Sequence, residues 1–168
     1  MTDSANLALK IVSLLPSATE IIDCLGLTHA LVGRSHECDY PPSVKDLPVC
    51  TEARLNSNKT SSDIDADVQT LMQKALSIYK IKTEVLEKLQ PTHIITQDQC
   101  DVCAVNLPEV ELAIAKLTNS YPQVISLQPD LLNEVWDDIK RVAKICIYRK
   151  CSFPSIFAIR EYRIEVIM

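Results

Sequence analysis

The sequence predicts an α/β fold, with a mostly parallel sheet that has helices on both faces. Short apolar segments alternate along the chain with longer amphipathic ones, and this alternation is typical of the crossover units that build parallel sheets. The 168 residues are enough for one full hydrophobic core. The composition, with 47% hydrophobic and 23% charged residues, is ordinary for a globular domain.

Five short apolar segments are predicted as strands. The first, IVSLL, ends at Pro16, which cannot donate a backbone hydrogen bond. The expected strands are residues 11–15, 31–33, 48–51, 92–96 and 123–127. Because helical segments separate most of them, we expect the strands to pair mainly in parallel.

Five amphipathic segments are predicted as helices. The first follows Pro16, because Ser17 and Glu20 have the spacing of a capping box and Gly26 supplies a C-terminal stop. The others are expected at residues 62–75, 82–89, 107–117 and 131 to about 145. The last of these is a long linker helix that carries Trp136. Residues 147–168, which hold both phenylalanines, differ in character and form an atypical tail.

Charge and hydropathy exclude several classes of partner. A net charge of −5 and a pI near 5.2 argue against nucleic acid and anionic membranes, since both need a basic patch. No apolar run approaches the roughly 18–20 residues that a membrane span needs. No basic and apolar leader precedes the first strand, so we expect no signal peptide and a cytoplasmic location.

The seven cysteines also favour a reducing compartment, because their number is odd and their spacing is not that of a disulfide framework. Cys24, Cys50 and Cys146 are expected to be small buried hydrophobic residues. The chain lacks a His-Glu-x-x-His motif and a nucleophile elbow, and its two glycines are too few for a dinucleotide or phosphate loop. We therefore expect a binding protein rather than an enzyme, without a resident cofactor.

Polar segments follow each predicted strand, at the edge where the carboxyl ends of parallel strands meet. Ligands of open parallel sheets bind at this edge. The segments are Pro16, Ser17 and Ala18 after the first strand, residues 34–42 after the second, 51–54 after the third, 97–103 after the fourth and 128–130 after the fifth. The sequence therefore predicts a binding site along this edge.

Single residues at this edge permit more than one role. Ser17 is expected to cap its helix, and the free amides beside it could also bind a phosphate, carboxylate or amide oxygen. His36 could ligate a metal ion, including the cobalt of a corrinoid, or hydrogen-bond within its loop. Tyr40 could stack on a large planar ligand or pack under the loop. His29 and His93 are expected at the surface or at the ends of elements.

Cys100 and Cys103 form a Cys-x-x-Cys pair at a predicted strand-to-helix junction. Such a pair can act as a redox dithiol when a helix N-terminus stabilises the thiolate, although two neighbouring aspartates oppose this. His36 and Cys38 could instead complete a Cys3His zinc site with them. With either the redox or the zinc role, the chain would be a small cytosolic thiol protein. Alternatively, the two thiols have no such chemistry and pack the edge of a cleft.

Four segments resemble a known family: IVSLLPSATEII, LVGRSHECDYPP, SSDIDADV and, most specifically, ITQDQCDVCAVN. They are similar to the N-terminal lobe of the cobalamin and iron-siderophore substrate-binding proteins of ABC transporters, the class III periplasmic binding proteins. The resemblance covers about residues 10–145 and is strongest to a cobalamin-binding branch with HECDYP and TQDQCDVCAV signatures.

The resemblance implies a Rossmann-like N-terminal lobe at residues 1–130, an inter-lobe helix at 131–146 and a tail at 147–168 in place of the second lobe, so we expect a truncated chain. It implies a corrinoid or metal-chelate ligand and an ABC permease as partner, in a family that is usually periplasmic. The implied cleft wall consists of Pro16, Ser17, Ala18, His36, Cys38, Asp39, Tyr40, Gln97, Asp98, Gln99 and Cys100.

Overall fold

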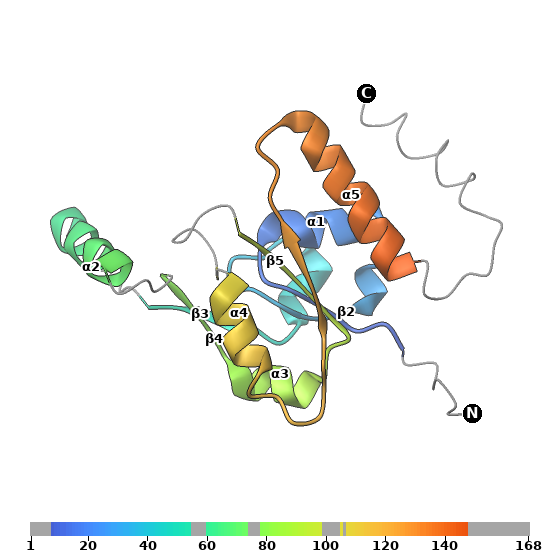
Figure 1. The fold of residues 1–168 in the computed structure, drawn as a ribbon, viewed down its shortest axis with the longest axis horizontal. Helices are drawn as coiled ribbons and strands as arrows, with labels where there is room; N and C mark the ends of the chain where they lie inside the picture. The colour runs from blue at the N-terminus through green and yellow to red at the C-terminus, as the bar shows by residue number, and fades with distance from the viewer. Residues whose placement is uncertain (1–7, 55–59, 74–77, 99–104, 106, 148–168) are drawn as a thin grey trace.

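The central sheet has four strands in the order β2-β1-β5-β6, and every pairing between them is parallel (Figure 1). The strands are β1 (Ile11–Ser13), β2 (Leu31–Arg34), β5 (His93–Gln97) and β6 (Gln123–Leu127). The structure, a computed structural model, describes residues 8–54, 60–73, 78–98, 105 and 107–147. It confirms the predicted α/β class with a mostly parallel sheet.

Side chains alternate between the two faces of the sheet and supply a separate core to each face. Ile11 and Ile95 belong to one core, whereas their chain neighbours Val12 and Ile94 belong to the other. All four side chains are completely buried. Strands that are buried on both faces need apolar residues at consecutive positions, which explains the continuous apolar runs in the sequence.

Helices cover both faces of the sheet, as predicted (Figure 1). One face carries α1 (Pro16–Cys24) and α5 (Leu132–Ile147), together with the short 3-10 helices η1 (Thr28–Ala30) and η2 (Pro42–Asp46). The other face carries α3 (Thr83–Leu89) and α4 (Leu107–Ile114). The C-terminal half of α5 places Val142 and Cys146 in the core with α1.

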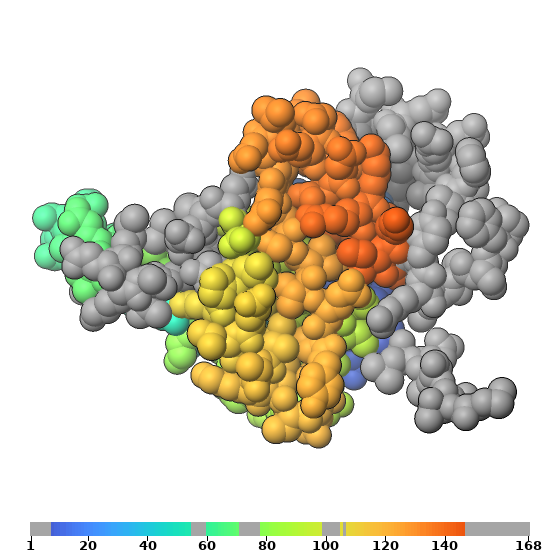
Figure 2. All heavy atoms as spheres, in the orientation of Figure 1, coloured from blue at the N-terminus to red at the C-terminus, as the bar shows by residue number. Residues whose placement is uncertain are grey.

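The remaining helix, α2 (Ser61–Gln73), extends away from the sheet and forms a separate protrusion (Figure 2). Its start and end lie within two residues of the predicted 62–75. Asp63 lies in its first turn, where a negative charge is favourable. Among the described residues, no helix combines the length and the apolar character that crossing a membrane requires.

The third predicted strand is wrong in its position and its pairing. Residues 51–53 form β3 (Thr51–Ala53), which pairs antiparallel with an unpredicted strand, β4 (Tyr79–Ile81), in a separate two-stranded sheet. The pairing places Glu52 opposite Lys80, and their charged atoms are 3.2 Å apart. Within the part of the chain that the structure describes, an isolated parallel bridge between Arg34 and Val49 links this region to the main sheet. These strands are too short for their pattern to reveal which partner they have.

The predicted capping box of α1 is also wrong. The helix begins one residue earlier, at Pro16, with Leu15 as N-cap and with no side-chain cap. Proline suits this first position because its fixed φ is helical and its missing N–H has no helical partner. The helix stop is confirmed, since Gly26 follows the C-cap with φ +72°, a left-handed conformation that favours glycine.

Of the positions predicted for Cys24, Cys50, Cys146, His29 and His93, the one for Cys24 is wrong. Cys50 and Cys146 are buried as expected, but Cys24 is exposed because it lies on the outer side of α1. His29 is exposed as expected. His93 lies at a strand end, as expected. It is only 1% exposed because β5 lies inside the sheet, between β1 and β6.

Candidate functional site

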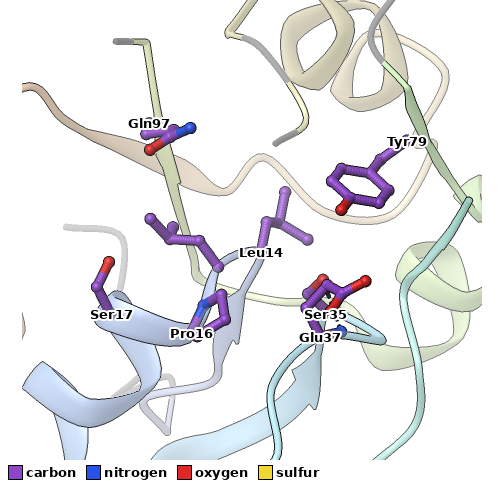
Figure 3. A pocket seen from close by; sticks show the side chains of 8 residues that line it. Leu14, Pro16, Ser17, Ser35, Glu37, Tyr79 and Gln97 are labelled. Atoms are coloured by element: carbon purple, nitrogen blue, oxygen red, sulfur yellow. Dashed lines mark hydrogen bonds between the residues drawn. The ribbon is translucent and has the colours of Figure 1, made fainter. Parts of the chain in front are cut away.

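The strand order creates a crevice at the carboxyl end of the sheet. From β1 the chain first adds β2 on one side and later returns to add β5 on the other side. The connections therefore leave β1 in opposite directions, and such a switch point is where parallel sheets bind ligands. A hollow of about 210 Å³ lies at this point (Figure 3). It is lined by Leu14, Leu15, Pro16, Ser17, Ser35, Glu37, Tyr79 and Gln97.

The hollow has two sides that come from different strands. Pro16 and Ser17 begin α1 directly after β1, and Gln97 ends β5 beside them. Glu37 from the loop after β2 and Tyr79 from β4 lie on the opposite side (Figure 3). The structure thus places Pro16, Ser17 and Gln97 at one edge of the sheet, and their contact with a ligand stays a prediction.

The beginning of α1 offers backbone donors to the hollow. The first amides of a helix have no acceptor within the helix, and here the amide of Thr19 is the first to find one, the carbonyl of Leu15 at 3.3 Å. Proline has no amide hydrogen, so Ser17 and Ala18 carry the first-turn amides that find no backbone acceptor among the described residues. Of these two residues, Ser17 lines the hollow. The Ala18 side chain itself is fully buried in the core.

The buried Thr19 hydroxyl connects this helix to β1 and to the loop after β2. The Thr19 hydroxyl lies 2.8 Å from the Ser13 hydroxyl and 3.1 Å from the thiol sulfur of Cys38. Cys38 is 1% exposed, and burial raises the pKa of its thiol. Cys38 therefore lies beneath the loop and is not on the surface of the hollow, which differs from its predicted place on the wall.

The Arg34 guanidinium holds the backbone of the same loop. It donates to the carbonyls of Ser35 and Cys38, both at 3.0 Å, and to the carbonyl of Lys45 at 3.1 Å. Because these acceptors are backbone groups, the path of the loop is fixed independently of its exposed side chains.

His36 points towards Thr51 and does not line the hollow. Its Nδ1 lies 2.7 Å from the Thr51 hydroxyl oxygen, which also accepts the backbone N–H of His36 at 3.0 Å. The ring packs edge-on against Tyr79, with the centroids 4.8 Å apart. Burial, partly opposed by the charge of Glu37, lowers the pKa of His36, so the neutral ring is favoured.

The surroundings of the ring also favour one tautomer. Nε2 lies 3.2 Å from Glu37 Oε1, although the two are not aligned as a hydrogen bond. A hydrogen on Nε2 would be attracted by this carboxylate, whereas a lone pair would be repelled. Nδ1 then accepts from the Thr51 hydroxyl. Nδ1 is engaged by Thr51, and Nε2 is buried beside Glu37, so cobalt ligation by His36 would require Glu37 to move.

The other predicted wall residues are divided between exposed positions and parts of the chain that are not described. Asp39 and Tyr40 lie in the loop after β2, where Asp39 is exposed and Tyr40 is 58% exposed. Stacking of Tyr40 on a planar ligand stays a prediction. Asp98 is exposed and accepts a 3.0 Å hydrogen bond from Gln128. Gln99, Cys100 and Cys103 lie outside the described residues.

No contact in the described part of the chain supports the predicted zinc site. His36 turns to Thr51 and Cys38 to Thr19. Within the described ranges, no group of three or more histidine, cysteine, aspartate or glutamate side chains could hold a metal ion. A metal or redox role for Cys100 and Cys103 stays a prediction.

Three lining residues lie outside the polar segments predicted for this edge: Leu14, Leu15 and Tyr79. Ser35 and Glu37 lie inside the predicted segment 34–42 after β2. Tyr79 reaches the hollow only because β4 pairs with β3, and no local pattern indicates that pairing.

Comparison with known proteins supports the fold. No family model and no curated protein matches the chain. Several solved structures do match, among them three binding proteins with TM-scores of 0.53 to 0.58. The periplasmic heme-binding protein of Roseiflexus is 24% identical, and the match covers 82% of this chain and 41% of that protein. The periplasmic heme-binding protein of Vibrio cholerae is 18% identical, and the match covers 95% of this chain and 47% of that protein. The periplasmic vitamin B12-binding protein of Vibrio cholerae is 22% identical, and the match covers 95% of this chain and 49% of that protein.

At these identities the likeness is one of fold. The chain spans less than half the length of each of the three proteins. It therefore has the fold of about half of a periplasmic solute-binding protein.

Proposed function

We propose that this chain forms one wall of a binding site for a corrinoid or a related metal chelate, as the N-terminal lobe of a two-lobed solute-binding protein. In this proposal residues 1–130 form the lobe, residues 131–146 form the connection towards a second lobe, and an ABC permease is the partner that receives the ligand.

One observation carries the proposal. The hollow lies at the switch point of the parallel sheet, and its lining comes from the ends of β1, β2 and β5 together with β4. Among the solved structures that share this fold are two heme-binding proteins and one vitamin B12-binding protein. Both of those ligands are large, flat metal complexes, which an open crevice at a sheet edge could accommodate.

The size of the hollow supports a shared site. Pockets for drug-sized ligands usually enclose about 300–1,000 Å³, and the hollow here has a volume of about 210 Å³. A ligand as large as a corrinoid would therefore contact this wall with only part of its surface. We expect the chain alone to bind in the micromolar range or more weakly.

Equilibrium dialysis of the reduced chain against cyanocobalamin would test the proposal, with folding checked by circular dichroism. The informative variant is Ser17→Trp, because Ser17 is exposed, lines the hollow and does not cap its helix. We expect the indole to fill the hollow and to weaken binding at least tenfold.

The matched control is Glu20→Trp, since Glu20 is exposed on the same helix and does not line the hollow. It should leave binding unchanged. Equal binding by Ser17→Trp and the parent chain would place the ligand elsewhere, and no binding up to millimolar cyanocobalamin would overturn the proposal for corrinoids.

A further inference from the structure

Two buried hydroxyl groups connect His36 to the hollow. The Thr51 hydroxyl lies 2.7 Å from His36 Nδ1 and 3.0 Å from the hydroxyl of Ser35, which lines the hollow (Figure 3). We infer that His36 and Thr51 orient the Ser35 hydroxyl, which offers a ligand a hydrogen-bond acceptor while His36 is neutral and a donor once His36 is protonated. This inference rests on the proposed function and adds a proton-dependent contact to the same site.

The argument begins with the hydrogen bonds that the Thr51 hydroxyl can make. A hydroxyl group donates one hydrogen bond and accepts two. The backbone N–H of His36 donates to Thr51 at 3.0 Å and uses one of the two acceptor positions. One donor and one acceptor position are left for two neighbours, the Ser35 hydroxyl and His36 Nδ1. Thr51 must therefore accept from one of these neighbours and donate to the other.

The state of the His36 ring decides between the two arrangements. In the neutral tautomer that Glu37 favours, Nδ1 carries no hydrogen and accepts from Thr51, so Thr51 has to accept from Ser35. In the protonated ring both nitrogens carry a hydrogen. Nδ1 then donates to Thr51, and Thr51 has to donate to Ser35. Protonation of the ring thus reverses the direction of the hydrogen bond between the two hydroxyls.

The reversal changes what Ser35 can offer to a ligand. In both states the backbone N–H of Glu37 donates to Ser35 Oγ, at 3.3 Å. While Ser35 donates to Thr51, one of its acceptor positions is left. Once Thr51 donates to Ser35, both acceptor positions are used and the Ser35 hydrogen is free for a partner in the hollow. Ser35 is 3% and Thr51 1% exposed, so bulk water competes little for these bonds.

The surroundings of His36 set the pH range of this change. Burial has the largest influence and lowers its pKa from the ordinary value of 6.5. Two nearby carboxylates favour the protonated ring, two nearby cations oppose it, and one tyrosine ring packs against it edge-on. In the described part of the chain these groups are Glu37 and Arg34 beside it, Glu52 on β3, Tyr79 on β4 and Lys82 after β4. We therefore expect the reversal below pH 6.5.

Nuclear magnetic resonance of the chain with 15N-labelled histidine would test the orientation without any ligand. In the neutral ring of His36 we expect a hydrogen on Nε2 and none on Nδ1. Ser35→Ala should move the titration midpoint of His36 to lower pH, because protonation would then leave the buried Thr51 hydrogen without an acceptor. Ser13→Ala is the matched control. Ser13 also carries a buried hydroxyl, but that hydroxyl contacts Thr19, so the midpoint should stay unchanged.

Equilibrium dialysis against cyanocobalamin at pH 8 would test whether a ligand uses the contact. One neutral hydrogen bond contributes about 0.5–1.5 kcal/mol, so Ser35→Ala should weaken binding about two- to tenfold. Ser13→Ala, whose hydroxyl is not part of the hollow's lining, should bind like the parent.

The two measurements separate the inference from the proposed function. Equal His36 midpoints in Ser35→Ala and the parent, or a hydrogen on Nδ1 of the neutral ring, would overturn the inference and leave the proposed function standing. Equal cyanocobalamin affinity in Ser35→Ala and the parent would overturn the ligand contact. Failure of the parent chain to bind cyanocobalamin would overturn the proposed function for corrinoids, whereas a shifted midpoint would still support the orientation of Ser35.

Discussion

Replacing Gly33 with alanine would place a methyl group in a space that neighbouring side chains already occupy. Gly33 lies in β2 opposite Val12 of β1. An added Cβ would approach the Cys50 sulfur to 2.6 Å, Leu89 Cδ1 to 2.7 Å and Val12 Cγ2 to 3.3 Å. The first two distances are far inside van der Waals contact, so at least two side chains must shift.

Overpacking of this kind usually costs about 1–3 kcal/mol. For a urea m-value near 2 kcal/mol/M, a loss of about 2 kcal/mol lowers the unfolding midpoint by about 1 M. Urea unfolding followed by circular dichroism would measure the shift. The Leu89 end is flexible, whereas Cys50 is completely buried. We therefore assign most of the cost to the sulfur.

Two further variants make the reasoning testable. Removing the sulfur with Cys50→Ala should reduce the penalty of Gly33→Ala by about 1 kcal/mol in a double-mutant cycle. Gly26→Ala is the control, because a Cβ at Gly26 meets nothing within 4 Å but its φ is +72°. That substitution should cost about 1 kcal/mol through backbone strain, with no relief from Cys50→Ala. A Gly33→Ala variant as stable as the parent would refute the packing argument.

Three other predictions concern buried polar groups. Burial raises the pKa of Cys50 to about 12 and of Cys146 to about 11, so both thiols should resist iodoacetamide at pH 8 while exposed Cys24 reacts, as measured by peptide mass spectrometry. The pKa of His36 is lowered by burial from its ordinary value of 6.5, so the folded state binds a proton less readily than the unfolded state. The stability that His36 contributes should be complete above about pH 6.5 and should decline as the pH falls below it, an effect that His36→Gln should remove from the urea midpoints. Thr51→Val should cost about 1–3 kcal/mol of folding free energy, because the Thr51 hydroxyl contacts Ser35 and both the ring and the backbone of His36.

Each of these predictions has an outcome that would contradict it. Modification of Cys50 at the rate of Cys24 in the folded chain would show that its site opens readily. Parallel pH profiles for the parent and His36→Gln would remove the role given to burial of the ring. Thr51→Ser retains the hydroxyl and should be more stable than Thr51→Val, and a Thr51→Val variant as stable as the parent would remove the role given to the hydroxyl.

The sequence predicts the main sheet well because its two inner strands are buried on both faces. Residues 11–15 and 92–96 have consecutive apolar positions, and local pattern alone is then sufficient. The β3 and β4 pair is different, since each strand has three residues. Their pairing joins segments about 28 residues apart, as Glu52 and Lys80 show, and such long-range contacts leave no periodic signal.

The hollow at the carboxyl edge of the sheet is predictable to the same degree. Ser17 and Gln97 were found because any residue that directly follows a parallel strand lies at the carboxyl edge. The direction of a side chain in an irregular loop does not follow from spacing, so Cys38 was placed on the wall although it points into the core. Tyr79 was missed because the strand that carries it was missed.

The way Arg34 holds the loop after β2 separates the shape of that loop from its recognition chemistry. Its three acceptors are main-chain carbonyls. Any residue at those positions would supply the same carbonyl if the loop kept its conformation. Exposed side chains such as Asp39 and Tyr40 can therefore be exchanged without loss of the anchor. The loop is a suitable place to build a library of variants with new ligand preferences, with Arg34 and the buried Cys38 kept constant.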